Sequence, residues 1–361
     1  MTTNQLSEQE SLDQYIGRMT LRFAIGTGII VGLVVLLANF NRNPVPMVGD
    51  GQAFGTLAFF STTLIALGAG VVAFVLGIRS WNERVAVHRQ RGWKLAVLPI
   101  AIAYTLMVAA AFILALQFIE FAFRDLRLAT FQGVFLAGLA SSVIIQWLVG
   151  RIMRISSSDL FVSILLIVGT GVYLTAAVID DPLWWEISFS YLGTINSNAN
   201  AIFNFTLVFA ALLLIAWLPY FMSDFRILVH HGLAPERSIR LIQIALLWLA
   251  IGIGFVGFFK SGLTPFSSLM HNLSAYSLAA ILGLLMAGVQ WLVPGFAREI
   301  FATSWALVAV LVATLLLAAF GYFNTVGLEI IAFALGLTWL SMFVRNTEST
   351  AAELEPSAFP N

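Results

Sequence analysis

Long apolar runs alternate with short polar segments along the whole chain. A helix of about 20 apolar residues crosses a bilayer core of about 30 Å, and ten runs meet this length. They predict an all-α bundle of ten membrane-spanning helices, joined by short connections that place successive helices side by side. The predicted spans lie near residues 20–40, 53–78, 95–118, 129–150, 159–179, 201–222, 241–259, 273–293, 303–323 and 326–344.

The composition agrees with a membrane protein. Apolar residues make up 60% of the 361 residues, charged residues make up 10%, and the mean hydropathy is +0.94. Soluble domains carry about a quarter charged residues. Acidic and basic residues number 18 each and leave no net charge, so we expect no nucleic-acid partner. The chain has no cysteine, which excludes disulfides and thiolate metal sites.

Basic residues gather on one side of the predicted topology. Only Arg42, Arg124, Arg127 and Lys260 lie on the other side. Since basic residues in short loops are retained in the cytoplasm, this distribution predicts a plasma-membrane protein with both termini cytoplasmic. The residues on the predicted cytoplasmic side are Arg18, Arg22, Arg79, Arg84, Arg89, Arg91, Lys94, Arg151, Arg154, Arg226, Arg237, Arg240, Arg298 and Arg345.

The spans fall into two predicted parts. A cytoplasmic segment at 1–19 precedes a four-helix part at 20–155, and a six-helix domain follows at 156–345. The tail at 346–361 is polar, acidic and Pro-terminated, and we predict that it is disordered in the cytoplasm. The basic loop at 79–94 fixes the topology and would also attract anionic lipid headgroups.

Small residues recur at four-residue spacing within several spans. Such spacing lets helix backbones approach closely. The contact would lie inside the bundle, in a homo-oligomer, or with another membrane partner, and the sequence does not separate these cases. The pairs are Gly28 with Gly32, Ala66 with Gly70, and Gly133 with Ala137.

Charged side chains avoid the middle of every predicted span. A charge within hydrocarbon costs several kcal/mol unless it is paired or hydrated, so its position points to function. Ion-coupled transport usually needs such groups near the midplane, and their scarcity argues against it. Glu329 lies one turn into the last span and is expected to pair with Lys260. The charged candidates lie near the outer ends of the spans: Glu120, Asp180, Asp181, Glu186, Lys260, His271 and Glu329. Uncharged polar residues nearer the middle include Gln117, Ser141, Ser142, Gln146 and Gln243.

The stretch at 180–204 concentrates polar and aromatic residues outside the membrane. With the outer loop at 260–274, it predicts a face that binds a membrane lipid or small amphiphile. The tryptophans would contact the apolar part, Lys260 would meet an anionic headgroup, and Asn204 and His271 would orient the ligand. The same residues also suit structural roles, such as an aromatic belt or the N-cap of the eighth span. The predicted ligand-binding residues are Trp184, Trp185, Glu186, Ser190, Asn204, Lys260, His271 and Asn272.

Two other functions remain open beside this non-enzymatic one. A membrane-embedded hydrolase would use Asp181, Glu186 and His271 with a metal, or Ser190 with His271. The spacing of these ligands matches no recognised metal site, and no nucleophile elbow precedes a serine. We therefore expect no resident metal or cofactor. The second alternative is a purely structural or partner-binding membrane protein.

Residues 157–345 resemble a bacterial membrane family. The similar segments are WWEISFSYLG at 184–193, IFNFTLVFAALLL at 202–214 and GFVGFFKSGLTPFSSLMHNLSA at 254–275. They resemble the family catalogued as domain of unknown function nine-nine-eight and, more remotely, DRAM-type membrane proteins. The resemblance implies a six-helix bundle and no established activity. It also implies an outer-loop motif from Ile187 to Gly193 with Ser188 or Ser190 as its serine, a helix start at Phe203 and Asn204, and a last segment containing Pro265 and His271.

Overall fold

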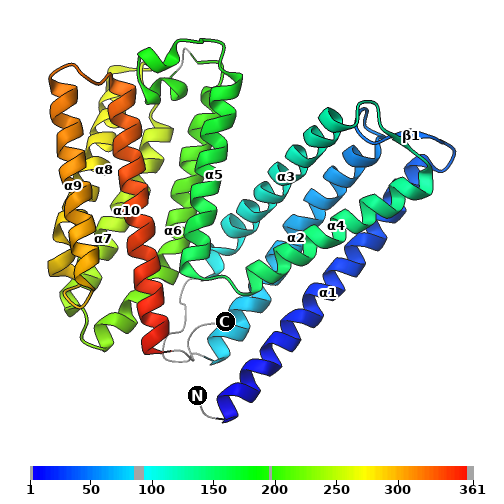
Figure 1. The fold of residues 1–361 in the computed structure, drawn as a ribbon, viewed down its shortest axis with the longest axis horizontal. Coiled ribbons are helices and arrows are strands. Elements are labelled where there is room, and N and C mark those ends of the chain that lie inside the picture. The colour runs from blue at the N-terminus through cyan, green and yellow to red at the C-terminus, as the bar shows by residue number, and fades with distance from the viewer. Residues whose placement is uncertain (1–2, 85–92, 195–196, 356–361) are drawn as a thin grey trace. The chain divides into compact units, whose positions relative to one another are not determined.

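The computed structural model describes residues 3–84, 93–194 and 197–355. Within them, ten helices are long and apolar enough to span a membrane, which confirms the predicted all-α fold (Figure 1). Their outward faces carry large apolar side chains, including Leu37 at 76% and Phe320 at 84% exposed. Soluble monomers rarely expose so much apolar surface, so lipid is the solvent for these faces. The chain is a multi-pass membrane protein.

The chain divides into two compact units, with the boundary between Ile155 and Ser156. Unit 1 contains α1 (Thr3–Asn39), β1 (Val45–Pro46), α2 (Phe54–Arg84), η1 (Trp93–Leu95), α3 (Val97–Ala122), β2 (Arg127–Leu128) and α4 (Thr130–Met153). Unit 2 contains α5 (Ser157–Val178), η2 (Trp184–Glu186), η3 (Phe189–Gly193), α6 (Asn200–His230), α7 (Glu236–Phe258), α8 (Pro265–Leu292), α9 (Arg298–Ala319) and α10 (Thr325–Leu354).

Close helix contacts hold unit 1 together. Helix α4 packs against α1 and α2, and α3 packs against α2. Where α1 meets α4, a Cβ built on Gly138 would lie only 2.9 Å from the carbonyl oxygen of Gly28. Where α2 meets α3, a Cβ built on Gly70 would lie 3.5 Å from Ala101. These glycines therefore serve packing inside the unit.

The α1–α2 and α3–α4 connections of unit 1 are joined by hydrogen bonds. Strands β1 and β2 pair antiparallel, with Val45 opposite Leu128. The Thr130 hydroxyl donates to the Arg42 carbonyl at 2.5 Å. The α1–α2 and α3–α4 connections therefore form one small structure at the ends of the four helices.

Helix α6 is the centre of unit 2 and is contacted by α5, α7 and α10. Helix α8 packs against α7 and α9, and α9 packs against α10. An aromatic core joins α6 to α10, with ring centroids 5.5 Å apart for Phe221 and Phe343 and 5.1 Å apart for Trp339 and Phe343. This core explains why α6 is the most buried of the spans.

Several helices extend beyond the predicted apolar spans, among them α1, α6 and α10. Helix α1 begins at Thr3, so most of the predicted N-terminal segment is helical, and α6 continues to His230. Hydropathy marks where a helix crosses the bilayer, whereas the helix itself ends where its packing ends. On α6, Phe225 and Leu228 lie beyond the predicted span and are fully buried.

Helix α10 runs to Leu354, so the predicted disorder is wrong for residues 346–354. Thr347 and Ala351 are fully buried, four residues apart on one face, and their burial stabilises the polar end of the helix. Residues 356–361 of the tail and 85–92 of the basic loop lie outside the described residues, and the proposals made for them stay predictions.

Candidate functional site

The segment between α5 and α6 folds into two short turns, η2 and η3, which are attached to α10. The backbone amide of Phe189 donates to Glu329 Oε2 at 2.5 Å, and the amide of Ser190 also donates to this carboxylate. Asn324 Nδ2 donates to the Trp185 carbonyl at 3.2 Å. Glu329 thus fixes η3 and forms no ion pair with Lys260, so the predicted pairing of these two residues is wrong.

The two predicted tryptophans lie in different environments. Trp184 is partly buried and packs against the cluster of Leu192, Phe203 and Leu207. Trp185 is 46% exposed. The described contacts give Trp184 a packing role, while Trp185 is free to contact lipid at the membrane surface.

Asn204 is used to hold the loop. Its side chain is 7% exposed, and Nδ2 donates to the Gly193 carbonyl at 2.9 Å. A Cβ built on Gly193 would lie 2.6 Å from Asn204 Oδ1 and 2.7 Å from the Phe203 ring. Only glycine permits this approach of η3 to α6, and the approach orients Asn204 toward the backbone.

His271 and Lys260 also have internal partners. His271 is 3% exposed, and its Nδ1 lies 3.0 Å from both the Val256 and the Phe259 carbonyl oxygens. Because both partners are acceptors, Nδ1 carries a proton and caps the end of α7. The Lys260 ammonium donates to Asn200 Oδ1 at 2.9 Å.

The predicted N-cap role of Asn272 is not observed. Helix α8 begins at Pro265, and its N-cap is Thr264, whose hydroxyl accepts from the Ser267 amide at 3.0 Å. Asn272 lies two turns into the helix and is exposed. The early start follows from the Thr-Pro pair, because proline suits the first position of a helix and threonine suits its cap.

We expect His271→Ala to destabilise unit 2 by about 1–3 kcal/mol, because two buried carbonyl groups lose their donor. Thermal unfolding of the purified protein in detergent measures this loss. Asn272→Ala, on the exposed neighbouring position, is the matched control and should change stability by less than about 0.5 kcal/mol. Equal stability of the two variants would contradict the capping role.

The residues of the hydrolase alternative have separate partners. Ser190 Oγ lies 3.2 Å from Ser188 Oγ, and Asp181 Oδ1 accepts from the Leu183 amide at 2.9 Å. Glu186 is exposed. Among the described residues, no group of three His, Asp or Glu side chains is placed to hold a metal ion. The contacts therefore do not assemble the predicted catalytic group.

Asp181 acts instead on Tyr191. Loss of hydration, the negative charge of Asp181 and a hydrogen bond to its carboxylate raise the pKa of the Tyr191 phenol. The phenol therefore stays neutral across the physiological range and donates to the carboxylate, which steadies η3.

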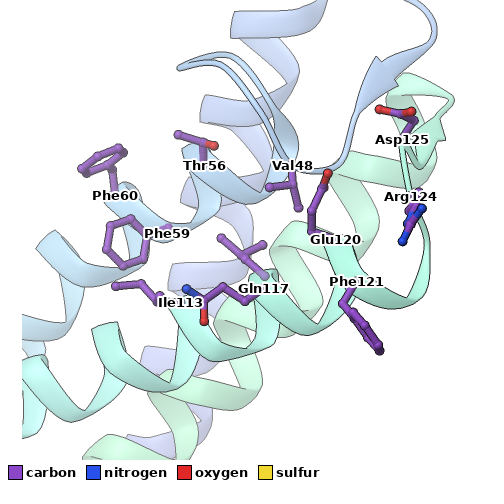
Figure 2. Close-up of a pocket in the computed structure, with 11 residues that line it drawn as sticks. Val48, Thr56, Phe59, Phe60, Ile113, Gln117, Glu120, Phe121, Arg124 and Asp125 are labelled. Atoms are coloured by element: carbon purple, nitrogen blue, oxygen red, sulfur yellow. The ribbon is translucent and has the colours of Figure 1, made fainter. Parts of the chain in front are cut away.

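Unit 1 contains a cavity of about 700 Å³ between α2, α3 and the α1–α2 connection (Figure 2). Phe59 and Phe60 of α2 and Ile113 and Leu116 of α3 supply its apolar wall. Val48 lines the cavity from the connection. This volume is within the range of small-molecule sites, about 300–1,000 Å³.

Polar side chains line the other end of the same cavity. Gln117 and Glu120 lie on the last turns of α3, and Arg124 and Asp125 follow in the connection to α4. Within the described part of the chain, none of these four side chains has an internal hydrogen bond or ion pair. They are available to a ligand. Asp125 has φ 53, a left-handed conformation that turns the chain at the rim.

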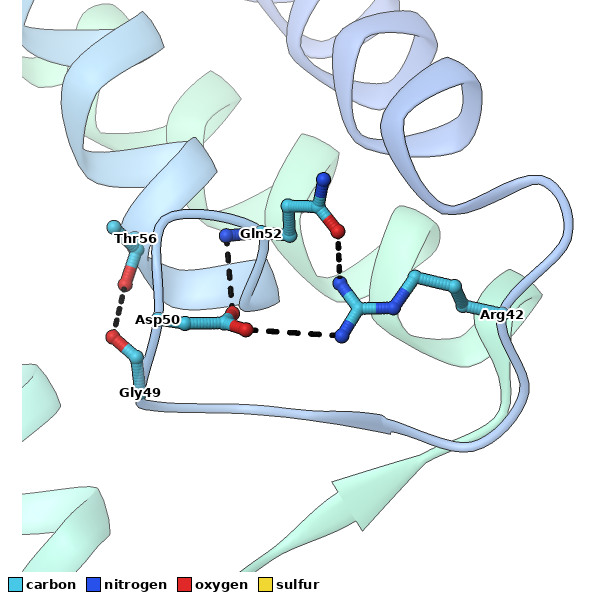
Figure 3. Close-up of polar contacts among 5 residues, drawn as sticks. All are labelled: Arg42, Gly49, Asp50, Gln52 and Thr56. Atoms are coloured by element: carbon cyan, nitrogen blue, oxygen red, sulfur yellow. Dashed lines mark hydrogen bonds and ion pairs between the residues drawn. The ribbon is translucent and has the colours of Figure 1, made fainter.

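A polar network stiffens the α1–α2 connection that forms one wall (Figure 3). The Arg42 guanidinium pairs with Asp50 at 3.7 Å and donates to the side-chain oxygen Oε1 of Gln52. The backbone amide of Gln52 donates to Asp50 Oδ1 at 3.1 Å. The Thr56 hydroxyl lies 3.4 Å from the Gly49 carbonyl oxygen. The Arg42 side chain thus stabilises the α1–α2 connection.

The spacing of polar residues near the end of α3 indicates this cavity in the sequence, although mean hydropathy does not. Ile113, Gln117, Glu120 and Arg124 follow one another at spacings of four, three and four residues. This spacing places them on one helical face. Polar residues at helical spacing toward the end of an apolar run indicate a face that is neither core nor ordinary lipid contact.

Comparisons of the chain with protein-family models, with curated proteins and with solved structures found no match in any of the three. The family resemblance of residues 157–345 stays a prediction.

Proposed function

We propose that this multi-pass membrane protein binds a membrane lipid or similar amphiphile in the unit 1 cavity, without catalysing a reaction. The supporting observation is the gradient of polarity along the cavity. Glu120 lies two residues before the end of α3, whereas Ile113 lies nine residues before it. At about 1.5 Å per residue, Ile113 is about 14 Å from the helix end.

The cavity changes from polar to apolar in the same order as a bilayer does from its headgroups to its hydrocarbon core. The polar groups lie where α3 would leave the membrane, together with Val48 and Phe121, and the other aromatic and aliphatic groups lie deeper along α2 and α3. A ligand with a polar head and an apolar tail fits both ends at once. From the distribution of basic residues, this end of unit 1 would be the outer side, with both termini cytoplasmic.

The charges at the rim favour one class of headgroup. Glu120 and Asp125 attract a cation, and Arg124 suits a phosphate because its planar guanidinium offers a fork of donors. A phospholipid that carries both an ammonium and a phosphate complements all three charges. The proposal therefore commits to a zwitterionic phospholipid.

Native mass spectrometry of the full-length protein, with synthetic phosphatidylethanolamine added in detergent, tests the proposal. We expect Ile113→Trp to fill the cavity and weaken lipid retention by at least about tenfold, which corresponds to about 1.4 kcal/mol. Leu114→Trp is the matched control, because Leu114 is 62% exposed and does not line the cavity. It should retain lipid like the wild type.

Three outcomes would contradict the proposal. Equal retention by the two tryptophan variants would exclude the cavity. Loss in Lys260→Ala, with retention in Ile113→Trp, would place the ligand on unit 2 instead. Tighter retention of phosphatidylglycerol than of phosphatidylethanolamine would exclude the zwitterionic headgroup.

A further inference from the structure

Three helices of unit 2 meet at a group of oxygen atoms from residues that lie outside the predicted spans. Ser157, the first residue of α5, has its hydroxyl within hydrogen-bond distance of Asp224 Oδ2 on α6 and, at 2.9 Å, of Glu348 Oε2 on α10. The Ser158 amide donates to the same Glu348 oxygen at 2.6 Å.

Two of these residues, Ser157 and Asp224, are removed from water and joined to the core, and Glu348 is half-buried. Ser157 is 3% exposed and Asp224 is 6% exposed. The Trp217 indole on α6 donates to the Ser157 carbonyl at 2.8 Å. The geometry of this junction is therefore fixed by packing as well as by its own hydrogen bonds.

The charged group that acts on Asp224 is another carboxyl group. From α10 it is Glu348, and from α5 the neighbouring polar group is the Ser157 hydroxyl. Helix α6 itself carries Arg226 and His230, and within the described residues neither side chain forms a hydrogen bond or ion pair with Asp224. In the described part of α7 and η3, which also pack on α6, no side chain forms an ion pair or hydrogen bond with Asp224. A cation does not compensate the pair within these residues.

The Ser157 hydroxyl has fewer protons than it has carboxyl oxygens to donate to. A serine hydroxyl has one proton and donates one hydrogen bond, yet its oxygen contacts two carboxyl oxygens. Two ionised carboxylates would leave one of these contacts as a repulsion between lone pairs. We propose that Asp224 and Glu348 hold one additional proton between them through Ser157, and that its release at higher pH loosens the end of α10 from α5.

The surroundings decide which carboxyl group carries the proton. Glu348 accepts the Ser158 amide at the N-terminus of α5, where the helix dipole favours an anion. Among the described residues, no backbone amide donates to Asp224, which is therefore the neutral partner. Its carboxyl O–H donates to Ser157 Oγ, and the Ser157 hydroxyl donates to Glu348.

The pH dependence follows from the proton count. The folded junction holds a proton that an unfolded, hydrated aspartate has already released at neutral pH, so the stability of the junction falls as pH rises through its titration. After release, two anions compete for one hydroxyl proton. The last turns of α10, from Asn346 to Leu354, then lose their attachment to α5.

Infrared spectroscopy of the full-length protein tests the proton directly. We expect the stretching band of a protonated carboxyl group at neutral pH, lost in Asp224→Asn and retained in Glu353→Gln. Glu353 is the matched control, because it is exposed on the same helix. Absence of the band in the wild type, or its persistence in Asp224→Asn, would overturn the proposal.

Hydrogen exchange of the wild type gives a second test that depends on no variant. As pH rises, exchange at 346–354, corrected for the intrinsic effect of pH, should increase several-fold over the same range in which the infrared band disappears. In Asp224→Asn, which keeps a donor toward Ser157, the corrected exchange should not change with pH. Corrected exchange in the wild type that is independent of pH would contradict the switch.

Discussion

Replacing Gly28 by leucine is expected to separate α1 from α4 and unfold much of unit 1. A Cβ at this position would lie 2.2 Å from Ser142 Oγ and 3.1 Å from the Gly138 carbonyl oxygen. Moving α4 aside would also break the hydrogen bond that the Ser142 hydroxyl donates to the Ala24 carbonyl on α1 at 2.9 Å. Overpacking typically costs 1–3 kcal/mol, and a four-carbon side chain against fixed backbone should cost about 3 kcal/mol or more.

Gly26→Leu is the matched control on the same helix. A Cβ on Gly26 meets nothing within 4 Å, so leucine should be accepted there and gain up to about 1 kcal/mol in helix propensity. Unfolding of both variants in detergent, followed by helical circular dichroism, measures the difference. Similar stability of the two would show that α1 does not depend on this contact with α4.

Much of the fold is predictable because each span is long and apolar. The ten spans follow from hydropathy, and the close contacts of α1 with α4 and of α2 with α3 include Gly28 and Gly70, which the spacing of small residues indicates. The end of α10 is not predictable in this way. Thr347 and Glu348 look like a solvated tail, yet Thr347 is fully buried and Glu348 accepts a hydrogen bond from Ser157, which is 191 residues away.

The partners of the candidate site residues could not be predicted from the sequence. The polar residues of 180–204 are conspicuous, yet Asn204 and Glu329 bind backbone groups whose positions depend on the folded loop. Ion pairing of Glu329 with Lys260 is a reasonable expectation from charge alone. It fails because two amides of η3 satisfy the carboxylate. The unit 1 cavity needs both α2 and α3 in place, so only its α3 face is visible in the sequence.

Replacing Trp217 by alanine should have the largest effect in unit 2. Its side chain is 2% exposed, with ring centroids 5.4 Å from Phe161 and 5.1 Å from Phe221. Truncating a buried tryptophan costs 3–5 kcal/mol in soluble proteins, through lost transfer energy and a cavity. In lipid the transfer part is smaller, because lipid tails are as apolar as the core. The cavity part remains, and we expect a loss of about 3 kcal/mol.

Trp217→Phe separates packing from hydrogen bonding at the same position. It keeps most of the ring contacts and removes the donor to the Ser157 carbonyl, which should cost about 1–2 kcal/mol. Trp291→Ala, on a side chain that is 63% exposed, is the control and should cost less than about 1 kcal/mol. Thermal unfolding in detergent should rank Trp217→Ala as least stable, then Trp217→Phe, then Trp291→Ala. Equal losses for Trp217→Ala and Trp291→Ala would mean that α6 is not the packing centre of unit 2. If Trp217→Phe were as stable as the wild type, the indole would not hold the N-terminus of α5, and the carboxyl pair would depend on Ser157 alone for its position.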